Sequence, residues 1–276
     1  MDRILVASDL SHRSDRAVGR AVALARAHRA GLTLCHVVDE AMPAEIAKKV
    51  EAEARESLDR FARSRAGADE VEIEVKTAIG DPVTDVCRIA SEVGAELFVV
   101  GSHRARMFFD GFRETTVERL IRLSEAPCLL VAEAADHDYE RVLTAVDMSP
   151  ACARAVAVAK AVAPDAALTL FHAYHVPFKG LTGEGDAASG AVRRIVEETE
   201  RAVDAWIAAS DLPADLPRPK LIDSAPRGAL DAMIASTGPH LLAIGAHTQS
   251  SVGRWALGGF AADLIRDPPC DLLIAR

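Results

Sequence analysis

The chain has 276 residues, of which 50% are hydrophobic and 26% are charged, and this is typical of a soluble globular protein with about two domains. The 32 basic and 41 acidic residues leave a net charge of −9, which argues against nucleic acid or an anionic membrane as the main partner. No run approaches the roughly 20 consecutive apolar residues that a membrane helix needs. The first apolar run stops at Asp9, which is too early for a secretory signal and fits an opening strand.

The cysteines and aromatic residues restrict the chemistry further. Five scattered cysteines without a C-x-x-C pair favour neither a disulfide framework nor a cysteine-rich zinc site, and they indicate a reducing, cytoplasmic compartment. Cys35 and Cys128 lie inside apolar runs, where a free cysteine behaves as a small hydrophobe. Because only 4% of the residues are aromatic, we expect a core made of Ala, Val, Leu and Ile.

The first half of the chain alternates short apolar runs with segments of helical spacing. Strands are predicted at residues 3–8, 32–38, 71–77, 96–101 and 128–132. Helices are predicted at residues 14–29, 44–64, 82–93 and around 117–121. Ser14 is the expected N-cap of the first helix and Gly31 its end. One face of the second helix is predicted to contain Ile46, Val50, Ala54, Leu58 and Phe61. Apolar strands joined by helices indicate a parallel sheet that is covered on both faces.

The second half repeats this pattern. The matching segments are 3–11 with 141–149, 32–38 with 167–175, 97–103 with 241–247, and 126–133 with 268–276. Asp147 follows Asp9 by 138 residues, and Gly245 follows Gly101 by 144. We infer an internal duplication with domains at 1–135 and 139–276.

One segment of the second half has no clear match. Residues 177–190 contain four glycines and few apolar residues, which predicts a loop that is either a disordered connector or a functional cover. A long helix is expected after this loop, with helical spacing at Val192, Ile195, Val196, Val203 and Trp206.

Ligands of open parallel sheets bind beyond the carboxyl ends of the strands. Two segments there, at 101–120 and 245–264, each run from a glycine into a predicted helix. Backbone N–H groups in such a loop, together with a helix N-terminus, can hold phosphate oxygens. The alternative is that Gly101 and Gly245 only permit a sharp turn.

The V-x-x-D-x-S opening, the strand ending in His-Val, the G-S-H turn and the Pro-Cys before each final strand resemble the universal stress protein family in a tandem, two-copy form. The resemblance covers nearly the whole chain. It implies two repeats, each a five-stranded parallel sheet flanked by helices, of the Rossmann-like, adenine nucleotide alpha hydrolase-like class. It also implies that the repeats pair internally through their last strands as a pseudo-dimer, with a homodimer of whole chains as a further option.

One branch of this family binds ATP through a glycine, two residues, a glycine, nine residues, and then a glycine with a hydroxyl residue. That register falls on Gly101, Arg104, Glu114 and Thr115 in repeat one, and on Gly245, Thr248, Gly258 and Gly259 in repeat two. Neither repeat carries the full motif. A carboxylate at position 114 would repel a triphosphate. Arg104 would either offset this repulsion through a phosphate contact or remain a solvated surface residue.

Further candidates are implied residue by residue. Asp9 and Asp147 match the acidic residue of the family's nucleotide cleft, although an aspartate there also caps a helix. Val37 and Ala173 match the residue whose backbone meets adenine, although both also fit plain core positions. The candidate nucleotide-binding residues are therefore Asp9, Val37, Gly101, Arg104, Thr115, Asp147, Ala173, Gly245, Thr248 and Gly258, with ATP as the candidate cofactor.

Other chemistry finds little support in the sequence. No G-x-S-x-G elbow, Walker motif or G-x-G-x-x-G after the first strand occurs. His36 and His103 in repeat one, and His172, His175 and His247 in repeat two, suggest a metal site, but no pair has H-x-x-x-H spacing and no carboxylate ligand is evident. We expect His36 and His172 at strand ends with satisfied hydrogen bonds, and we predict no catalytic residue and no metal.

The expectation is therefore a cytoplasmic, non-catalytic stress-response protein that acts by binding, protection or signalling. Its partner would be an unidentified protein rather than nucleic acid or a membrane. The alternative is an ATP-binding switch or a slow ATP hydrolase that uses one of the two clefts.

Overall fold

The computed structural model describes residues 1–65, 67–102, 115–176, 186–246 and 258–276. The chain forms two compact units. Unit one contains residues 1–138 and 246–275, and unit two contains residues 139–245 with Arg276. This division differs from the predicted sequence repeats, because the last helix and strand of repeat two belong to unit one. The domain boundaries at 1–135 and 139–276 stay a prediction.

Unit one contains a sheet with the strand order β3-β2-β1-β4-β5-β10. Its strands are β1 (Arg3–Ala7), β2 (Gly31–Asp39), β3 (Ile73–Gly80), β4 (Leu97–Gly101), β5 (Cys128–Val131) and β10 (Asp271–Ala275). The first five strands are mutually parallel, as predicted. Strand β10, which comes from repeat two, runs antiparallel to β5 with Leu273 opposite Leu129.

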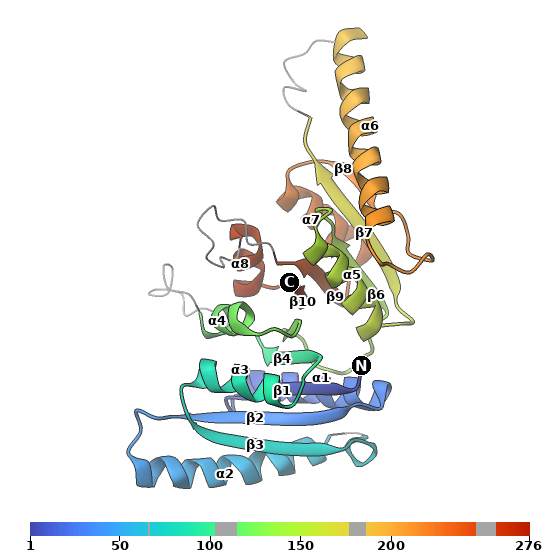
Figure 1. Ribbon diagram of the computed structural model, residues 1–276. Helices are drawn as coiled ribbons and strands as arrows, with labels where there is room; N and C mark the ends of the chain where they lie inside the picture. The colour runs from blue at the N-terminus through green and yellow to red at the C-terminus, as the bar shows by residue number, and fades with distance from the viewer. Residues whose placement is uncertain (66, 103–114, 177–185, 247–257) are drawn as a thin grey trace. The chain divides into compact units, whose positions relative to one another are not determined.

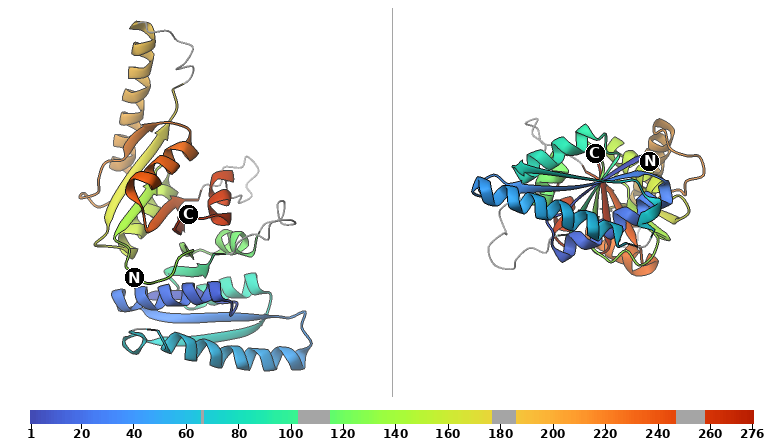
Figure 2. Two further views of the ribbon diagram at one scale, coloured as in Figure 1. Left: turned by 180° about the vertical axis from the view of Figure 1, so that it is seen from behind. Right: turned by 90° about the horizontal axis from the view of Figure 1, so that it is seen from below.

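Helices cover both faces of this sheet. They are α1 (His12–His28), α2 (Ala44–Arg63), α3 (Pro82–Glu92), α4 (Thr116–Leu123) and α8 (Gly259–Arg266), with a short 3-10 helix η1 (Ala68–Glu70). Helices α1 and α2 contact each other on one face, and α3 and α4 contact each other on the other. Figure 1 is viewed from the α3 side, and the left view of Figure 2 brings α1 forward.

The start and end of α1 differ from the prediction. Its N-cap is Ser11 rather than Ser14, because the extended backbone of Ser11 lets its hydroxyl accept a hydrogen bond from the Ser14 N–H. The helix ends at Arg29, whose φ of 54° is left-handed, whereas Gly31 already opens β2. Ser14 is thereby buried in the first turn of the helix.

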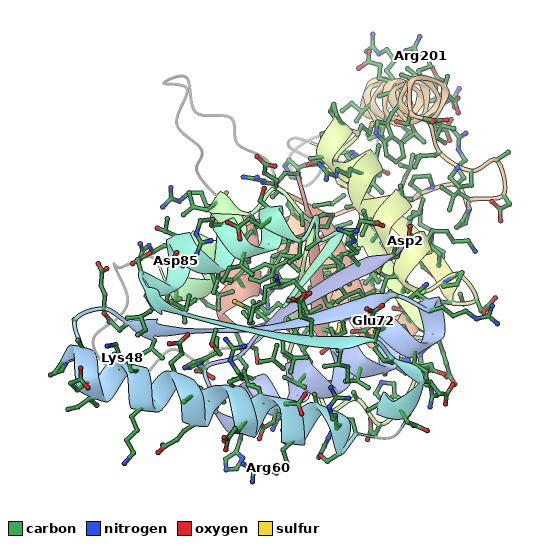
Figure 3. The ribbon with its side chains drawn as sticks, turned by 60° about the horizontal axis from the view of Figure 1, so that its bottom comes forward. Asp2, Lys48, Arg60, Glu72, Asp85 and Arg201 are labelled. Carbon is green, nitrogen blue, oxygen red and sulfur yellow. The ribbon has the colours of Figure 1, made fainter. Side chains whose placement is uncertain are left out.

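Helix α2 turns most of the predicted face inward, with Ala54 and Leu58 buried and Val50 and Phe61 half-buried, but the prediction is wrong for Ile46. The buried positions are Ala47, Ala54, Leu58 and Ala62, and Ile46 is 53% exposed. The buried face is rich in alanine, whose small side chains let a helix pack close to its neighbours. Charged side chains such as Lys48 and Arg60 occupy the outer face (Figure 3).

Unit two contains parallel strands in the order β9-β6-β7-β8. Its elements are β6 (Arg141–Ala145), α5 (Pro150–Val162), β7 (Ala167–Tyr174), α6 (Asp186–Ala209), β8 (Lys220–Asp223), α7 (Pro226–Thr237) and β9 (Leu241–Gly245). The predicted loop at 177–190 is wrong for residues 186–190, which belong to α6, and residues 177–185 lie outside the described part. Of the predicted α6 face, Val203 and Trp206 are buried.

The core is mainly aliphatic, as the low aromatic content predicted. All five cysteines are free, and Cys35 and Cys128 are buried. Burial raises the pKa of Cys35 to about 12, so it remains a protonated, apolar group at neutral pH. No helix within the described ranges has both the length and the apolar character needed to cross a bilayer.

Candidate functional site

A cavity of about 290 Å³ opens in unit one at the carboxyl ends of β1, β2 and β4. The strand order of the sheet reverses at β1, which has β2 on one side and β4 on the other. Ligands of open α/β sheets bind beyond the carboxyl ends of the strands at such a reversal. We call this cavity the repeat-one cleft. Its lining residues are Ala7, Ser8, Asp9, Ser11, Arg13, Ser14, His36, Val37, Pro82, Val86, Val100, Gly101, Ser102, Thr116, Val117 and Leu120.

A hydrogen-bonded turn forms the polar side of the cleft. Asp9 Oδ1 accepts hydrogen bonds from the Ser11 N–H at 3.0 Å and from the Ser14 hydroxyl. Leu10, between them, has a left-handed φ of 62°. Burial alone would raise the pKa of Asp9, but the hydrogen bonds from Ser11 and Ser14 outweigh it and hold the pKa below its usual value. Asp9 is therefore a charged acceptor that braces the start of α1, while Ser11 is the cap.

Gly101 brings the end of β4 close to the start of α1. A Cβ at Gly101 would lie 2.8 Å from the Arg13 carbonyl oxygen and 3.1 Å from the Ser14 nitrogen. Its φ lies outside the left-handed region, so a sharp turn is not the reason for the glycine. The strand end and the helix start touch through their backbones, and this contact forms the floor of the cleft.

Val37 and His36 lie on the β2 side. Val37 lines the cleft and is 8% exposed. The His36 Nδ1 lies 2.8 Å from the Ser8 carbonyl oxygen, which makes Nδ1–H the donor and fixes the ring. The expected satisfied hydrogen bond at this strand end is confirmed.

Thr115 lies at the start of α4 as its N-cap. Its hydroxyl accepts from the Glu118 N–H at 3.1 Å, and Glu118 Oε2 accepts from the Thr115 N–H at 2.6 Å, a reciprocal capping box. Glu118 Oε1 also lies 3.1 Å from Arg266 Nε of α8. The hydroxyl predicted to contact a phosphate thus already has a structural role.

The model of the universal stress protein family matches residues 1–132 and again residues 138–276. The chain belongs to the universal stress protein family. It carries two domains of that family in tandem, with an α/β sheet of mostly parallel strands flanked by helices.

Individual relatives agree with this assignment. The universal stress protein YxiE of Bacillus subtilis (strain 168) is 29% identical over 146 residues, which are 47% of this chain and 98% of that protein. A universal stress protein structure from Archaeoglobus fulgidus DSM 4304 has a TM-score of 0.69 at 19% identity and covers 99% of this chain and 98% of that one. A structure from Pseudomonas aeruginosa UCBPP-PA14 has a TM-score of 0.67 at 12% identity, over 100% and 93% of the two chains. At these identities the structures show the fold alone.

In this universal stress protein, the second repeat builds the same turn in unit two. Asp147 Oδ1 accepts from the Ser149 N–H at 3.1 Å and from its hydroxyl at 2.7 Å. Ser149 caps α5, and Met148 has a left-handed φ of 64°, as Leu10 has in repeat one. The His172 Nδ1 lies 2.7 Å from the Val146 carbonyl oxygen.

The remaining repeat-two candidates do not lie in one unit. Ala173 is in β7 and Gly245 ends β9, both in unit two. A Cβ at Gly245 would lie 2.6 Å from the Cys152 nitrogen, so this glycine also permits a close backbone contact. Gly258 is the N-cap of α8 in unit one.

Several candidates remain untested. Arg104 and Thr248 lie outside the described residues, as do Glu114, His103 and His247. Nucleotide contacts at the other candidates stay predictions. Within the described ranges, no group of three or more His, Cys, Asp or Glu side chains is placed to hold a metal ion.

Sequence reasoning missed part of the cleft wall. Val86 of α3 and the α4 residues Thr116, Val117 and Leu120 line the cavity. They lie on the first turns of helices that follow strands, or one turn further, and helix starts face the carboxyl edge of a parallel sheet. The sequence could have indicated these cleft residues, because they follow soon after predicted strands.

Proposed function

We propose that this chain is a non-catalytic, cytoplasmic binding protein of the stress response, and that the repeat-one cleft is its ligand site. The cleft carries the proposal because it combines an apolar wall with a polar rim. Val37, Val86 and Leu120 belong to the wall, and Asp9 and Arg13 to the rim. Small-molecule sites have this construction, with a few polar groups that orient an apolar or aromatic body.

The size of the cleft favours a compact ligand. Its volume of about 290 Å³ lies at the lower limit of the roughly 300–1,000 Å³ typical of such sites. A nucleoside or nucleoside monophosphate fits this class better than ATP, since the glycine pattern that would hold a triphosphate is incomplete.

The polar contacts in the cleft support binding rather than turnover. The Ser14 hydroxyl donates to Asp9, and the Ser11 hydroxyl caps α1. The His36 ring meets a backbone carbonyl rather than a hydroxyl. An activated nucleophile needs a base within hydrogen-bond reach of it. The Asp9 carboxylate lies within reach of the Ser14 hydroxyl, but the lowered pKa of Asp9 makes it a weak base.

Thermal shift and calorimetry test the proposal with AMP, adenosine and ATP with Mg²⁺. A ligand at 100 times its Kd stabilises the folded state by about 2.7 kcal/mol. We expect AMP or adenosine to raise the Tm, and Thr116→Trp, which adds bulk at the exposed cleft rim, to abolish the shift. Gly258→Glu is the matched control, because a Cβ there meets no atom of the described residues within 4 Å and the residue lies outside this cleft.

Two results would redirect the proposal. Loss of the shift in Gly258→Glu with retention in Thr116→Trp would assign the ligand to repeat two. If the protein releases phosphate from ATP and Thr116→Trp abolishes this release, the protein is a slow ATP hydrolase and not a non-catalytic binding protein.

A further inference from the structure

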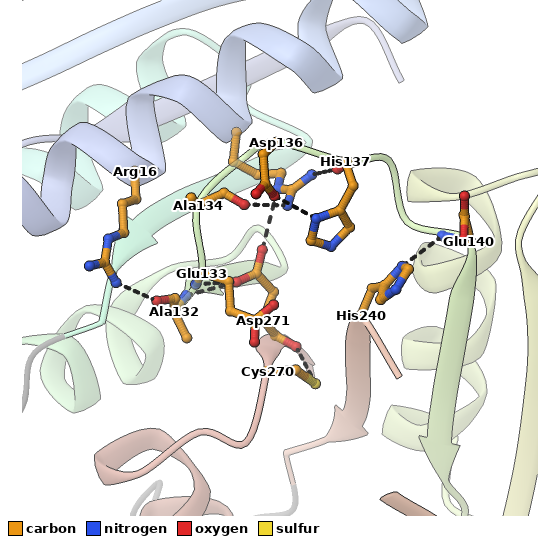
Figure 4. A network of polar contacts seen from close by, with 11 residues as sticks. Arg16, Ala132, Glu133, Ala134, Asp136, His137, Glu140, His240, Cys270 and Asp271 are labelled. Carbon is orange, nitrogen blue, oxygen red and sulfur yellow. Dashed lines mark hydrogen bonds and ion pairs between the residues drawn. The ribbon is translucent and has the colours of Figure 1, made fainter. Parts of the chain in front are cut away.

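A buried ion pair links the first helix of repeat one with the last strand of repeat two. Arg20 of α1 is 2% exposed and Asp271 of β10 is fully buried. The Arg20 Nε lies 3.3 Å from Asp271 Oδ2. Asp271 also contacts Ala132 and Glu133 (Figure 4). Arg20 and Asp271 both belong to unit one. Such a pair is tolerated in a core only because each charge compensates the other.

The Arg20 side chain also holds the segment that follows β5. Its Nη1 donates to the His137 carbonyl oxygen at 2.6 Å, and its Nη2 to that of Ala134 at 3.4 Å. One turn earlier in α1, Arg16 Nη1 donates to the Ala132 carbonyl oxygen at 2.8 Å. Two arginines of α1 therefore fix the chain between β5 and repeat two.

Asp271 completes the same arrangement from the β10 side. Its Oδ1 accepts hydrogen bonds from the N–H groups of Ala132 at 2.8 Å and Glu133 at 3.0 Å. The carboxylate thus binds one guanidinium and two backbone donors, all contributed by residues of repeat one. An apolar side chain at this place would leave these part-buried N–H donors without this acceptor and the guanidinium without its counter-charge.

The basic partner exists in only one repeat. Arg20 lies nine residues after the N-cap Ser11, and the residue nine after the N-cap Ser149 is Val158. The α5 helix of repeat two therefore has an apolar side chain where α1 has the guanidinium.

The acidic partner, Asp271, also occurs in only one of the two repeats. The Ser102 N–H donates to Val131 O at 2.8 Å and the Ala246 N–H to Ala275 O at 2.6 Å, so Ala275 corresponds to Val131. Asp271, four residues earlier, then corresponds to Pro127. Matching the Pro-Cys sequences instead makes Leu129 its counterpart. Neither residue is charged.

We propose that the face of repeat one formed by α1, β5 and residues 132–137 selects the last strand of repeat two and rejects the corresponding strand of a second copy of repeat one. In a pairing of two repeat-one copies, Arg20 would be buried beside Pro127 or Leu129. In a pairing of two repeat-two copies, Asp271 would be buried beside Val158. Both arrangements leave an uncompensated charge, whereas the pairing within the chain leaves none.

The strands alone do not make this choice. The antiparallel ladder of β5 and β10 pairs leucine with leucine at Leu129–Leu273 and Leu130–Leu272. An antiparallel pair of similar strands is self-complementary, so the backbone bonds and apolar contacts allow a like pairing as well. Specificity must therefore come from side chains that differ between the repeats.

A second ion pair provides a contrast. Glu118 of α4 pairs with Arg266 of α8. The sequence Leu-Ile-Arg occurs in both helices, at 120–122 and at 264–266, so repeat one has Arg122 where repeat two has Arg266. The acid would find an arginine in a pairing of two repeat-one copies too, so this contact does not reject that pairing.

A double-mutant cycle in the full chain tests the proposal. At this contact, Asp271→Leu reproduces the pairing of two repeat-one copies, and Arg20→Val reproduces that of two repeat-two copies. For each single variant we expect a lower urea midpoint and an increase of about 100-fold or more in amide exchange of β10, because one buried charge loses its partner. The double variant Arg20→Val/Asp271→Leu should lose clearly less than the sum of the two single losses, because neither charge is then left alone, although the hydrogen bonds to residues 132–137 stay lost. Arg266→Ala combined with Asp271→Leu is the control and should give additive effects.

Each outcome of the double-mutant cycle either supports or contradicts the proposed selection between strands. If the losses of the two single variants simply add in the double variant, or if Asp271→Leu is as stable as the parent, the pair does not select between partners. A single variant that fails to fold while the double variant folds supports the selection. A double variant that also fails to fold overturns it.

Discussion

Gly101 offers a direct test of how the repeat-one cleft is built. Substituting alanine would place a Cβ 2.8 Å from the Arg13 carbonyl oxygen, 2.9 Å from its carbon and 3.1 Å from the Ser14 nitrogen. All three atoms are backbone atoms at the start of α1, so no side-chain rotation relieves the overlap. The end of β4 and the start of α1 must move apart, as in other overpacked cores.

The size of the effect follows from this overlap. Overpacking costs about 1–3 kcal/mol, which corresponds to a fall in Tm of roughly 2–10 °C for a protein of this size class. Gly258→Ala is the matched control, because a Cβ there meets nothing within 4 Å in the part of the chain that the structure describes, and the backbone φ is −60°. We expect its Tm to stay close to that of the parent in the same calorimetric scan.

Comparing Gly101→Ala with Gly258→Ala shows whether close packing or conformational freedom of the backbone is the reason for a glycine at position 101. If Gly101→Ala were as stable as Gly258→Ala, the close approach of β4 and α1 would not be a constraint, and our account of the cleft floor would be wrong. If Gly101→Ala is destabilised, Gly245→Ala should be destabilised too, because its Cβ would lie 2.6 Å from the Cys152 nitrogen.

Three further predictions concern hydrogen bonds near the helix starts. Thr115→Ala should lower stability by about 0.5–2 kcal/mol in urea titration, because it removes one arm of the capping box with Glu118, while Thr115→Ser should cost much less. The pKa of Asp9 is lowered in the folded chain, so its charge stabilises the fold above pH about 4 and that contribution disappears as the pH falls through the lower folded value. The deficit of Asp9→Asn in urea midpoint should therefore shrink between pH about 6 and about 3, and a constant deficit would contradict this. Trp206→Phe should cost about 0.5–1.5 kcal/mol, because the indole N–H donates to the Ser149 carbonyl oxygen at 3.1 Å, and an unchanged unfolding curve would show that water replaces the bond.

The duplication and the alternation of strands and helices along repeat one were readable from the sequence. Buried strands such as β4, at Leu97–Gly101, are continuous apolar runs, and period and run length do not depend on distant partners. The turn around Asp9 and its copy around Asp147 were also visible, because short polar sequences after a strand form their hydrogen bonds locally.

The sequence-based predictions were wrong in detail for the cap of α1 and for one position on the buried face of α2. Ser14 was the predicted cap of α1, but β1 ends at Ala7 and α1 begins at His12, which makes Ser11 the cap. On α2, the predicted face is buried at Ala54 and Leu58 but not at Ile46, and the helix also buries the alanines at 47 and 62, whose small side chains allow close packing.

The sequence by itself determined that two similar α/β repeats would form, since hydrophobic period and turn residues act over a few positions. Tertiary structure alone brought Asp271 to Arg20, which is 251 residues away in the chain. It also showed that Gly101 serves a backbone contact with Arg13 rather than a turn. Both outcomes depend on distances between elements that are remote in sequence, and no local pattern encodes such a distance.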